Sequence, residues 1–103
     1  MVNEMEMIDL ERLALVYPKS VKLTGRQYTL EALVIQELLD HSIKASLDLE
    51  AKRLEEKVTY SLTEKGKQAL WEYYQGEVGL VSDDPAARNF CQHFLLELKD
   101  DRR

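Results

Sequence analysis

The chain has 103 residues and a mass of 12.0 kDa, with 45% hydrophobic and 32% charged residues. This composition is typical of one globular domain, 1–103, and the single cysteine excludes an internal disulfide. The net charge of −5 excludes a strongly basic nucleic-acid coat protein and a polybasic membrane binder. The sequence has no apolar run long enough to span a membrane and no basic leader before an apolar stretch, so we expect a cytoplasmic protein.

The N-terminal part of the sequence predicts two helices with a short strand between them. Apolar residues recur near helical spacing over 5–17, and Pro18 ends this helix. The segment 19–25 alternates and closes on a glycine, which predicts a brief strand and a turn. Thr29 predicts the N-cap of a second helix that runs to about His41.

The segment 43–56 admits two interpretations. From Ile43 to Ala51 apolar and polar residues alternate strictly, which is typical of a half-buried strand. The same stretch is rich in helix formers and contains an apolar stripe at helical spacing, made of Ile43, Leu47, Leu54 and Val58. The unbroken alternation favours the strand.

The next segment predicts a strand followed by a helix. Residues 57–62 alternate, with β-branched and aromatic side chains prominent among them, as in a strand. Thr63 predicts the N-cap of a helix that ends near Gln75, with Gly76 just beyond its end. Residues 76–82 are expected to form a loop.

The C-terminal part predicts one more helix. Asp84 followed by Pro85 is a strong start signal, because proline is favoured at the first helical position. The helix is expected over 85–99, and a charged tail over 100–103.

No group of residues indicates catalysis. Cys91 and His93 are close in sequence, but two positions apart on a helix they point about 200° away from each other. Cys91 falls on an apolar stripe, which predicts a buried and unreactive thiol. His41 is expected at a helix end, where an imidazole hydrogen-bonds with the terminal carbonyl groups or packs against the helix. The sequence lacks metal-ligand spacing and phosphate-loop or hydrolase motifs, so we expect no enzyme, cofactor or metal.

One strand-to-helix junction carries a resemblance to a known family. The segment reads Tyr60-Ser-Leu-Thr-Glu-Lys-Gly66; Tyr60 and Leu62 would point into the core, Thr63 would cap the helix and Gly66 would allow close packing. This pattern resembles the junction in winged-helix regulators of the MarR and PadR types. The resemblance implies an α+β, winged-helix-like domain, mostly helical with a small antiparallel sheet. It also implies a homodimeric, DNA-binding transcriptional regulator.

In that family a helix-turn-helix and a wing precede the junction, whereas here only residues 42–60 separate it from the second helix. A helical 43–56 would supply a recognition helix without a wing. A strand there would form a long hairpin and leave recognition to helix 29–41. That helix carries three acids and no base-reading Arg or Lys.

The predicted DNA-binding residues lie mainly on the hairpin. Lys52, Arg53 and Lys57 bracket its tip, where a wing would reach phosphates or the minor groove. Lys44 and Arg26 are predicted as secondary phosphate contacts. The alternative function is a protein-interaction module on the same scaffold without DNA binding, which the acidic balance favours.

The terminal helices, 5–17 and 85–99, are expected to form a homodimer interface. The first is apolar on nearly all sides, and the last carries Phe90, Phe94 and an additional Leu96 off its main stripe. The expected partners are therefore a second copy, with double-stranded DNA or another protein in addition, and no membrane.

Overall fold

The computed structural model describes residues 4–100 of the chain, with side chains described from Glu6 onward. These residues form four α-helices, one 3-10 helix and three strands, which confirms the expected α+β class. The elements in chain order are α1 (Glu4–Val16), β1 (Val21–Thr24), α2 (Tyr28–Ile35), β2 (Leu39–Asp48), β3 (Arg53–Leu62), α3 (Glu64–Tyr73), the 3-10 helix η1 (Gly76–Leu80) and α4 (Pro85–Asp100).

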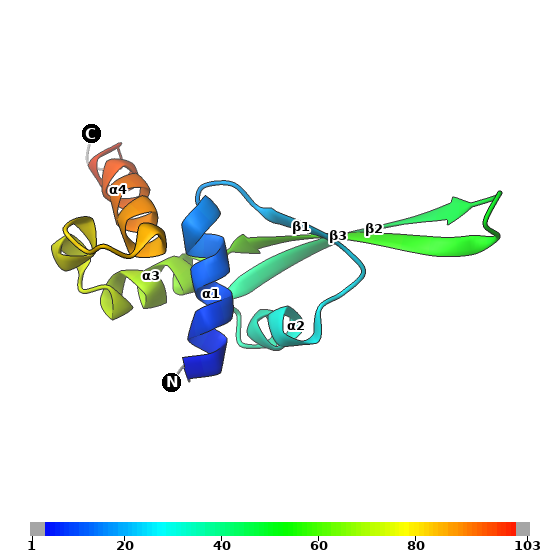
Figure 1. The fold of residues 1–103 in the computed structure, drawn as a ribbon, viewed down its shortest axis with the longest axis horizontal. Helices are drawn as coiled ribbons and strands as arrows, with labels where there is room; N and C mark the ends of the chain where they lie inside the picture. Colours follow the sequence, from blue (N-terminus) through cyan, green and yellow to red (C-terminus); the bar gives the residue numbers. More distant parts are fainter. Residues whose placement is uncertain (1–3, 101–103) are drawn as a thin grey trace.

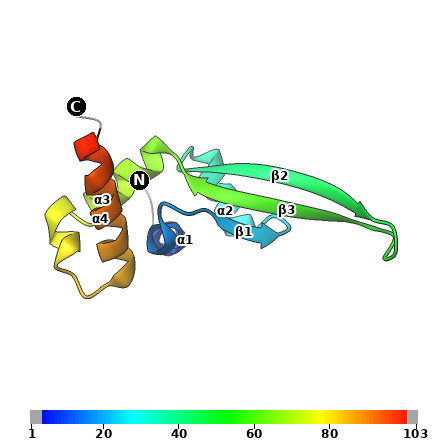
Figure 2. The same ribbon diagram turned by 90° about the horizontal axis from the view of Figure 1, so that it is seen from above.

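The three strands form one antiparallel sheet in the order β1-β3-β2. Strands β2 and β3 pair without interruption from Leu39↔Leu62 to Asp48↔Arg53. Strand β1 pairs only with residues 57–60 of β3. The distal arm, residues 45–56, therefore projects from the helical body as a two-stranded ribbon (Figures 1 and 2). The molecule is accordingly elongated, at 51 × 32 × 24 Å.

The core lies between the helices and one face of the sheet, called here the inner face. Val58 and Tyr60 point to this face and are fully buried, while their neighbours Lys57 and Thr59 point to the outer face. The side chains with the greatest burial come from every part of the chain: Leu10, Leu13, Leu30, Leu33, Leu39, Val58, Tyr60, Leu70, Phe90 and Cys91. The basal half of the sheet and the helices therefore share one core.

The junction between β3 and α3 has the geometry expected from its sequence. The Thr63 hydroxyl accepts a hydrogen bond from the Gly66 N–H at 3.0 Å and donates to the Glu37 carbonyl at 2.5 Å. A Cβ atom on Gly66 would overlap the backbone carbonyl of Leu38. The predicted cap at Thr63 and the predicted close approach at Gly66 are both confirmed.

The second helix was predicted too long, and its predicted N-cap was wrong. Helix α2 begins at Tyr28, with Gln27 rather than Thr29 at the N-cap position, and ends at Ile35. Glu37 then adopts φ of +65°, and Leu38 donates its N–H back to the Leu33 carbonyl. This left-handed residue turns the chain into β2, whose first residue, Leu39, is buried under the helices.

The predicted strand in the ambiguous segment is confirmed as far as Asp48. Residues 49–52 form the turn of the hairpin, so 43–56 contains no recognition helix. His41 lies within β2 rather than at a helix end, and its Nδ1 is 2.7 Å from a Glu31 carboxylate oxygen.

The C-terminal elements agree closely with the prediction. Helix α3 ends at Tyr73, after which Gln75 and Gly76 both take positive φ, and the expected loop after Gly76 contains η1. Helix α4 begins at Pro85, and Asp84 accepts a hydrogen bond from the Ala86 N–H at 3.0 Å. Asp100 ends α4, and the predicted tail beyond it lies outside the described residues.

The terminal helices bury most of their apolar surface within one chain. Helix α1 packs against α4, and both Phe90 and Phe94 lie in the core. Among the side chains that the structure describes on these two helices, only Ile8, Leu15, Val16 and Leu96 are large, apolar and exposed. The surface that suggested dimerisation through these helices is therefore largely covered already, and the homodimer itself stays a prediction.

Candidate functional site

Three lysines from three different strands share the outer face of the sheet. Lys44 of β2 is the direct cross-strand partner of Lys57 of β3. Lys22 of β1 is opposite Thr59, the next outer-face residue along β3. Because directly opposed residues of an antiparallel pair point to the same side, these side chains form one group, called here the three-lysine face.

The three-lysine face gathers three positive charges that form no ion pairs in the described part of the chain, while Asp40 and Glu55 lie farther along the same face of the sheet. All three lysines are exposed, and none forms an ion pair with a carboxylate of residues 4–100. They surround a shallow hollow of about 390 Å³ whose lining includes the hydroxyl side chains of Thr24, Ser42 and Thr59. Like charges directly opposite each other destabilise a sheet, so an anion bound here would relieve the repulsion.

The structure separates the predicted DNA-binding residues into three places. Lys44 and Lys57 lie together on the three-lysine face. Lys52 lies in the hairpin turn, and Arg53 pairs in register with the acidic Asp48 at the end of the arm. Because β-strands rise about 3.3 Å per residue, Arg53 is roughly 13 Å along the strand from Lys57. The tip and the lysine face are therefore distinct surfaces.

Arg26 belongs to neither surface. Its guanidinium lies 3.4 Å from the Glu56 carboxylate and 3.9 Å from that of Glu31. Glu56 alternates with Lys57 and points to the inner face, so Arg26 lies on the opposite side of the sheet from the three-lysine face. Its charge is balanced by two acids before any ligand is bound.

Lys22 is the member of the group that the sequence reading missed. The signal was present in Val21-Lys22-Leu23-Thr24, where the apolar residues alternate with polar ones and are the more buried. That alternation predicts an outward Lys22, but it does not show that β1 pairs with β3 beside Lys57. Only the register brings the three amines together.

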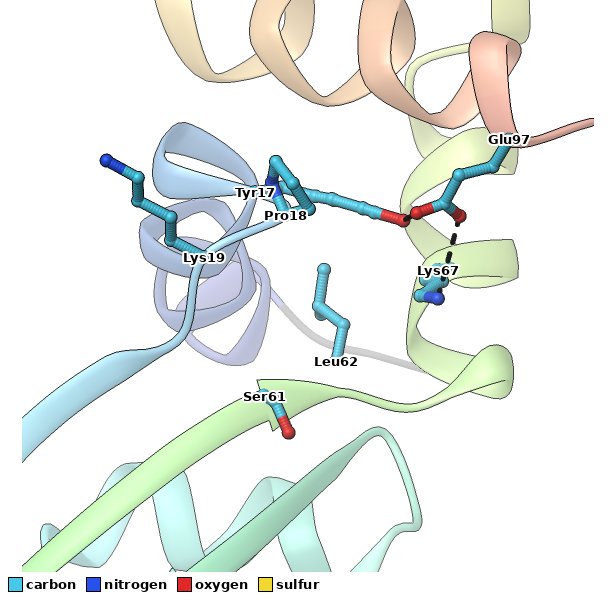
Figure 3. Close-up of a pocket in the computed structure, with 7 residues that line it drawn as sticks. All are labelled: Tyr17, Pro18, Lys19, Ser61, Leu62, Lys67 and Glu97. Atoms are coloured by element: carbon cyan, nitrogen blue, oxygen red, sulfur yellow. Dashed lines mark hydrogen bonds and ion pairs between the residues drawn. The ribbon is translucent and has the colours of Figure 1, made fainter. Parts of the chain in front are cut away.

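A second hollow, of about 130 Å³, lies where the end of α1 meets α3 and α4 (Figure 3). The Tyr17 hydroxyl donates a hydrogen bond to the Glu97 carboxylate, and Lys67 forms an ion pair with the same carboxylate at 3.6 Å. The Lys67 amine also lies 5.5 Å from the centre of the Tyr17 ring. Burial, together with Glu97, raises the pKa of the Tyr17 phenol far above its ordinary value. The polar groups of Tyr17, Lys67 and Glu97 therefore have partners in one another. Their contacts join the end of α1 to α3 and α4, and we assign them a structural role.

Cys91 is buried, as predicted, and does not form a dyad with His93. Its side chain is fully covered, and burial raises the pKa of the thiol. The His93 ring nitrogen Nδ1 lies 2.8 Å from the Asn89 carbonyl oxygen, one turn back on the same helix. Within residues 4–100, no group of three or more His, Cys, Asp or Glu side chains is placed to hold a metal ion.

We expect Cys91→Ala to lower the free energy of unfolding by about 1 kcal/mol, because it removes one buried sulfur atom from the core. We also expect the native thiol to react with a thiol reagent only as fast as the protein unfolds, because the group is buried and protonated. Urea denaturation and the rate of thiol labelling in native buffer measure these two effects. Rapid labelling of the folded protein would contradict the structural role.

Comparison with known proteins found no family model, no curated protein and no solved structure that matches this chain. Among the residues that the structure describes, no helix has the length and apolar character needed to cross a membrane.

Proposed function

We propose that the protein is a DNA-binding transcriptional regulator that contacts the phosphate backbone of double-stranded DNA through its three-lysine face. The observation that carries this proposal is the group formed by Lys22, Lys44 and Lys57, whose amines lack carboxylate partners in the described chain. The resemblance at Tyr60–Gly66 supports it, since the strand-to-helix junction has the predicted capping geometry. A lone buried cysteine is consistent with a cytoplasmic regulator.

The structure favours binding by the hairpin rather than by a recognition helix. Helix α2, the single helix between β1 and β2, has eight residues, none of which is Arg or Lys. The three lysines lie outside the distal arm, where β1 makes the sheet three strands wide, so this face would lie against phosphates rather than enter a groove. Phosphate contacts carry no sequence information, so we expect weak sequence preference and strong salt dependence.

Replacing the three lysines together with alanine should flatten the dependence of log affinity on log salt concentration by about two to three units, because each phosphate contact contributes about 0.9 to the slope. Fluorescence anisotropy with a labelled random duplex, titrated at several salt concentrations, measures this change. We expect weaker binding at every salt concentration.

A second variant, with Lys52, Arg53 and Lys99 replaced by alanine, is the matched control because it removes the same charge from outside the three-lysine face. It should change the slope much less. Equal effects of the two variants would mean that any loss of three positive charges weakens binding, and this would contradict the assignment to the three-lysine face. An unchanged slope in the first variant would overturn the proposal.

The exposed leucines near the hairpin tip favour a second candidate function, the recognition of another protein. Leu47 and Leu54 are cross-strand partners on the arm, each 63% exposed, and Leu49 in the turn is 78% exposed. The acids Asp48 and Glu50 lie among them, which makes this tip a poor surface for phosphates. Failure to bind duplex DNA at low salt would favour this function.

A further inference from the structure

We propose that two copies of the chain associate through the free edge of β2, antiparallel and with Ser46 of one copy opposite Ser46 of the other. This joins the two arms into a four-stranded ribbon, with one helical body at each end. The inference rests on the geometry of the arm and is independent of the DNA-binding proposal.

The outer edge of β2 is free and regular. In the order β1-β3-β2, no other strand of residues 4–100 pairs with this edge. The ladder with β3 has consecutive pairs along its whole length, and β2 contains no proline. Both views show the distal arm clear of the helices (Figures 1 and 2). A long edge without a proline or a bulge is a template for another strand.

Hydrogen bonding at the base of the hairpin shows which backbone groups are available. Thr63 donates its N–H to the Leu38 carbonyl at 3.2 Å, which places this pair among the hydrogen-bonded ones. Such pairs recur at every second residue of an antiparallel ladder, so the even-numbered residues of β2 bond to β3. Ile43, Ala45 and Leu47 therefore direct their N–H and C=O groups outward.

The edge is complementary to itself in the register centred on Ser46. Lys44 then lies opposite Asp48 of the partner subunit, and by the two-fold symmetry the same pair forms a second time. These are non-hydrogen-bonded positions, where opposed side chains approach each other most closely. Ala45 lies opposite Leu47 of the partner subunit at a hydrogen-bonded position. Charge and backbone pairing therefore agree in this register.

The neighbouring registers are less favourable. Centring the pair on Lys44 opposes like charges, and centring it on Ile43 or Ala45 leaves Lys44 opposite a serine. Centring it on Ser42 restores a Lys–Asp pair, but it would direct the partner's turn toward residues 32–35, which belong to helix α2. The register on Ser46 places that turn farther from the helix, opposite residues 40–43 of β2.

The same register explains the exposed leucines of the arm. Leu47 and Leu54 lie side by side on the inner face, with no core above them. Pairing adds Ala45 of the partner subunit beside Leu47 and brings the two sets of leucines into one apolar strip. Asp48 of the partner subunit lies beside Lys44, and its negative charge offsets the repulsion between Lys44 and Lys57. Lys22 and Lys57 stay available for phosphate.

Sedimentation equilibrium across the micromolar range tests this association. The wild-type chain should reach about twice its 12.0 kDa mass. Lys44→Asp and Asp48→Lys should each weaken self-association by about tenfold, because two attractive pairs in each dimer become repulsive. An equimolar mixture of the two variants should associate about as strongly as wild type, since every heterodimer restores both opposite-charge pairs.

Ala45→Pro tests the edge without a change of charge. It removes an outward N–H and preserves the ladder with β3, so it should abolish association while circular dichroism stays native. Lys22→Ala with Lys57→Ala should leave the mass unchanged and weaken only DNA binding, which separates the two proposals.

A wild-type chain that stays monomeric throughout the concentration range would overturn the proposal. The proposal would also be overturned if the mixture of Lys44→Asp and Asp48→Lys associated no more strongly than either variant alone. Loss of the dimer on Ile8→Glu or Leu96→Glu, with no effect of Ala45→Pro, would instead assign the interface to the terminal helices.

Discussion

Phe94→Glu should unfold the protein at any concentration instead of converting a dimer into a folded monomer. Phe94 is only 6% exposed, and its ring lies 5.2 Å from that of Phe90 and 5.3 Å from that of Trp71. Losing a buried phenylalanine costs about 4 kcal/mol, and burying a carboxylate without a partner adds to that cost. The total is comparable to the whole stability of a small domain, about 5–15 kcal/mol.

Leu96→Glu is the matched control for this substitution, because it places the same charge two residues away on the same helix. Leu96 is 55% exposed, so we expect a change of at most about 0.5 kcal/mol in the free energy of unfolding. Circular dichroism and urea denaturation distinguish the two variants. A Phe94→Glu protein that melts cooperatively near the wild-type temperature would contradict the packing described for α4.

Gly66→Ala should destabilise the protein by about 3 kcal/mol, at the upper end of ordinary overpacking. The added methyl would overlap the Leu38 carbonyl, which is backbone and cannot move aside as a flexible side chain would. That carbonyl also accepts the Thr63 N–H, so displacing it disturbs the hydrogen bond that joins the base of β2 to the start of α3.

Gln68→Ala, an exposed change in the same helix, should alter stability by no more than about 0.5 kcal/mol. Thermal denaturation of both variants measures the contrast. If Gly66→Ala were as stable as Gln68→Ala, the close contact between α3 and the chain before β2 would be wrong.

The sequence predicted the elements whose signals are local. Thr63 as a cap and Asp84-Pro85 as a helix start act within one turn of chain, and both are confirmed. The end of α2 had no such signal, because Glu37 turns the chain with φ of +65° where glycine would be expected. Burial of the following leucines against the core holds Glu37 in this conformation, and that is a tertiary effect.

The candidate site was only partly predictable, because it depends on register. Lys44 and Lys57 were identified separately, yet their direct opposition and the addition of Lys22 follow from pairing across distant parts of the sequence. The same limit applies to Phe90 and Phe94. The sequence pattern around them is the same whether they pack against a partner subunit or against the core of their own chain. A hydrophobic stripe shows which face of a helix is buried and does not show what covers it.

The projection of the arm beyond β1 also affects how the molecule opens over time. Residues 45–56 form a ribbon of only two strands with leucines in water, and an isolated two-stranded hairpin is marginally stable. Its backbone amides should therefore exchange with solvent through local opening, long before the core around Tyr60 unfolds globally. A partner strand that holds the arm in place must first offset the entropy of that motion. The part of the fold best placed to make contact is also the part that any contact would stabilise most.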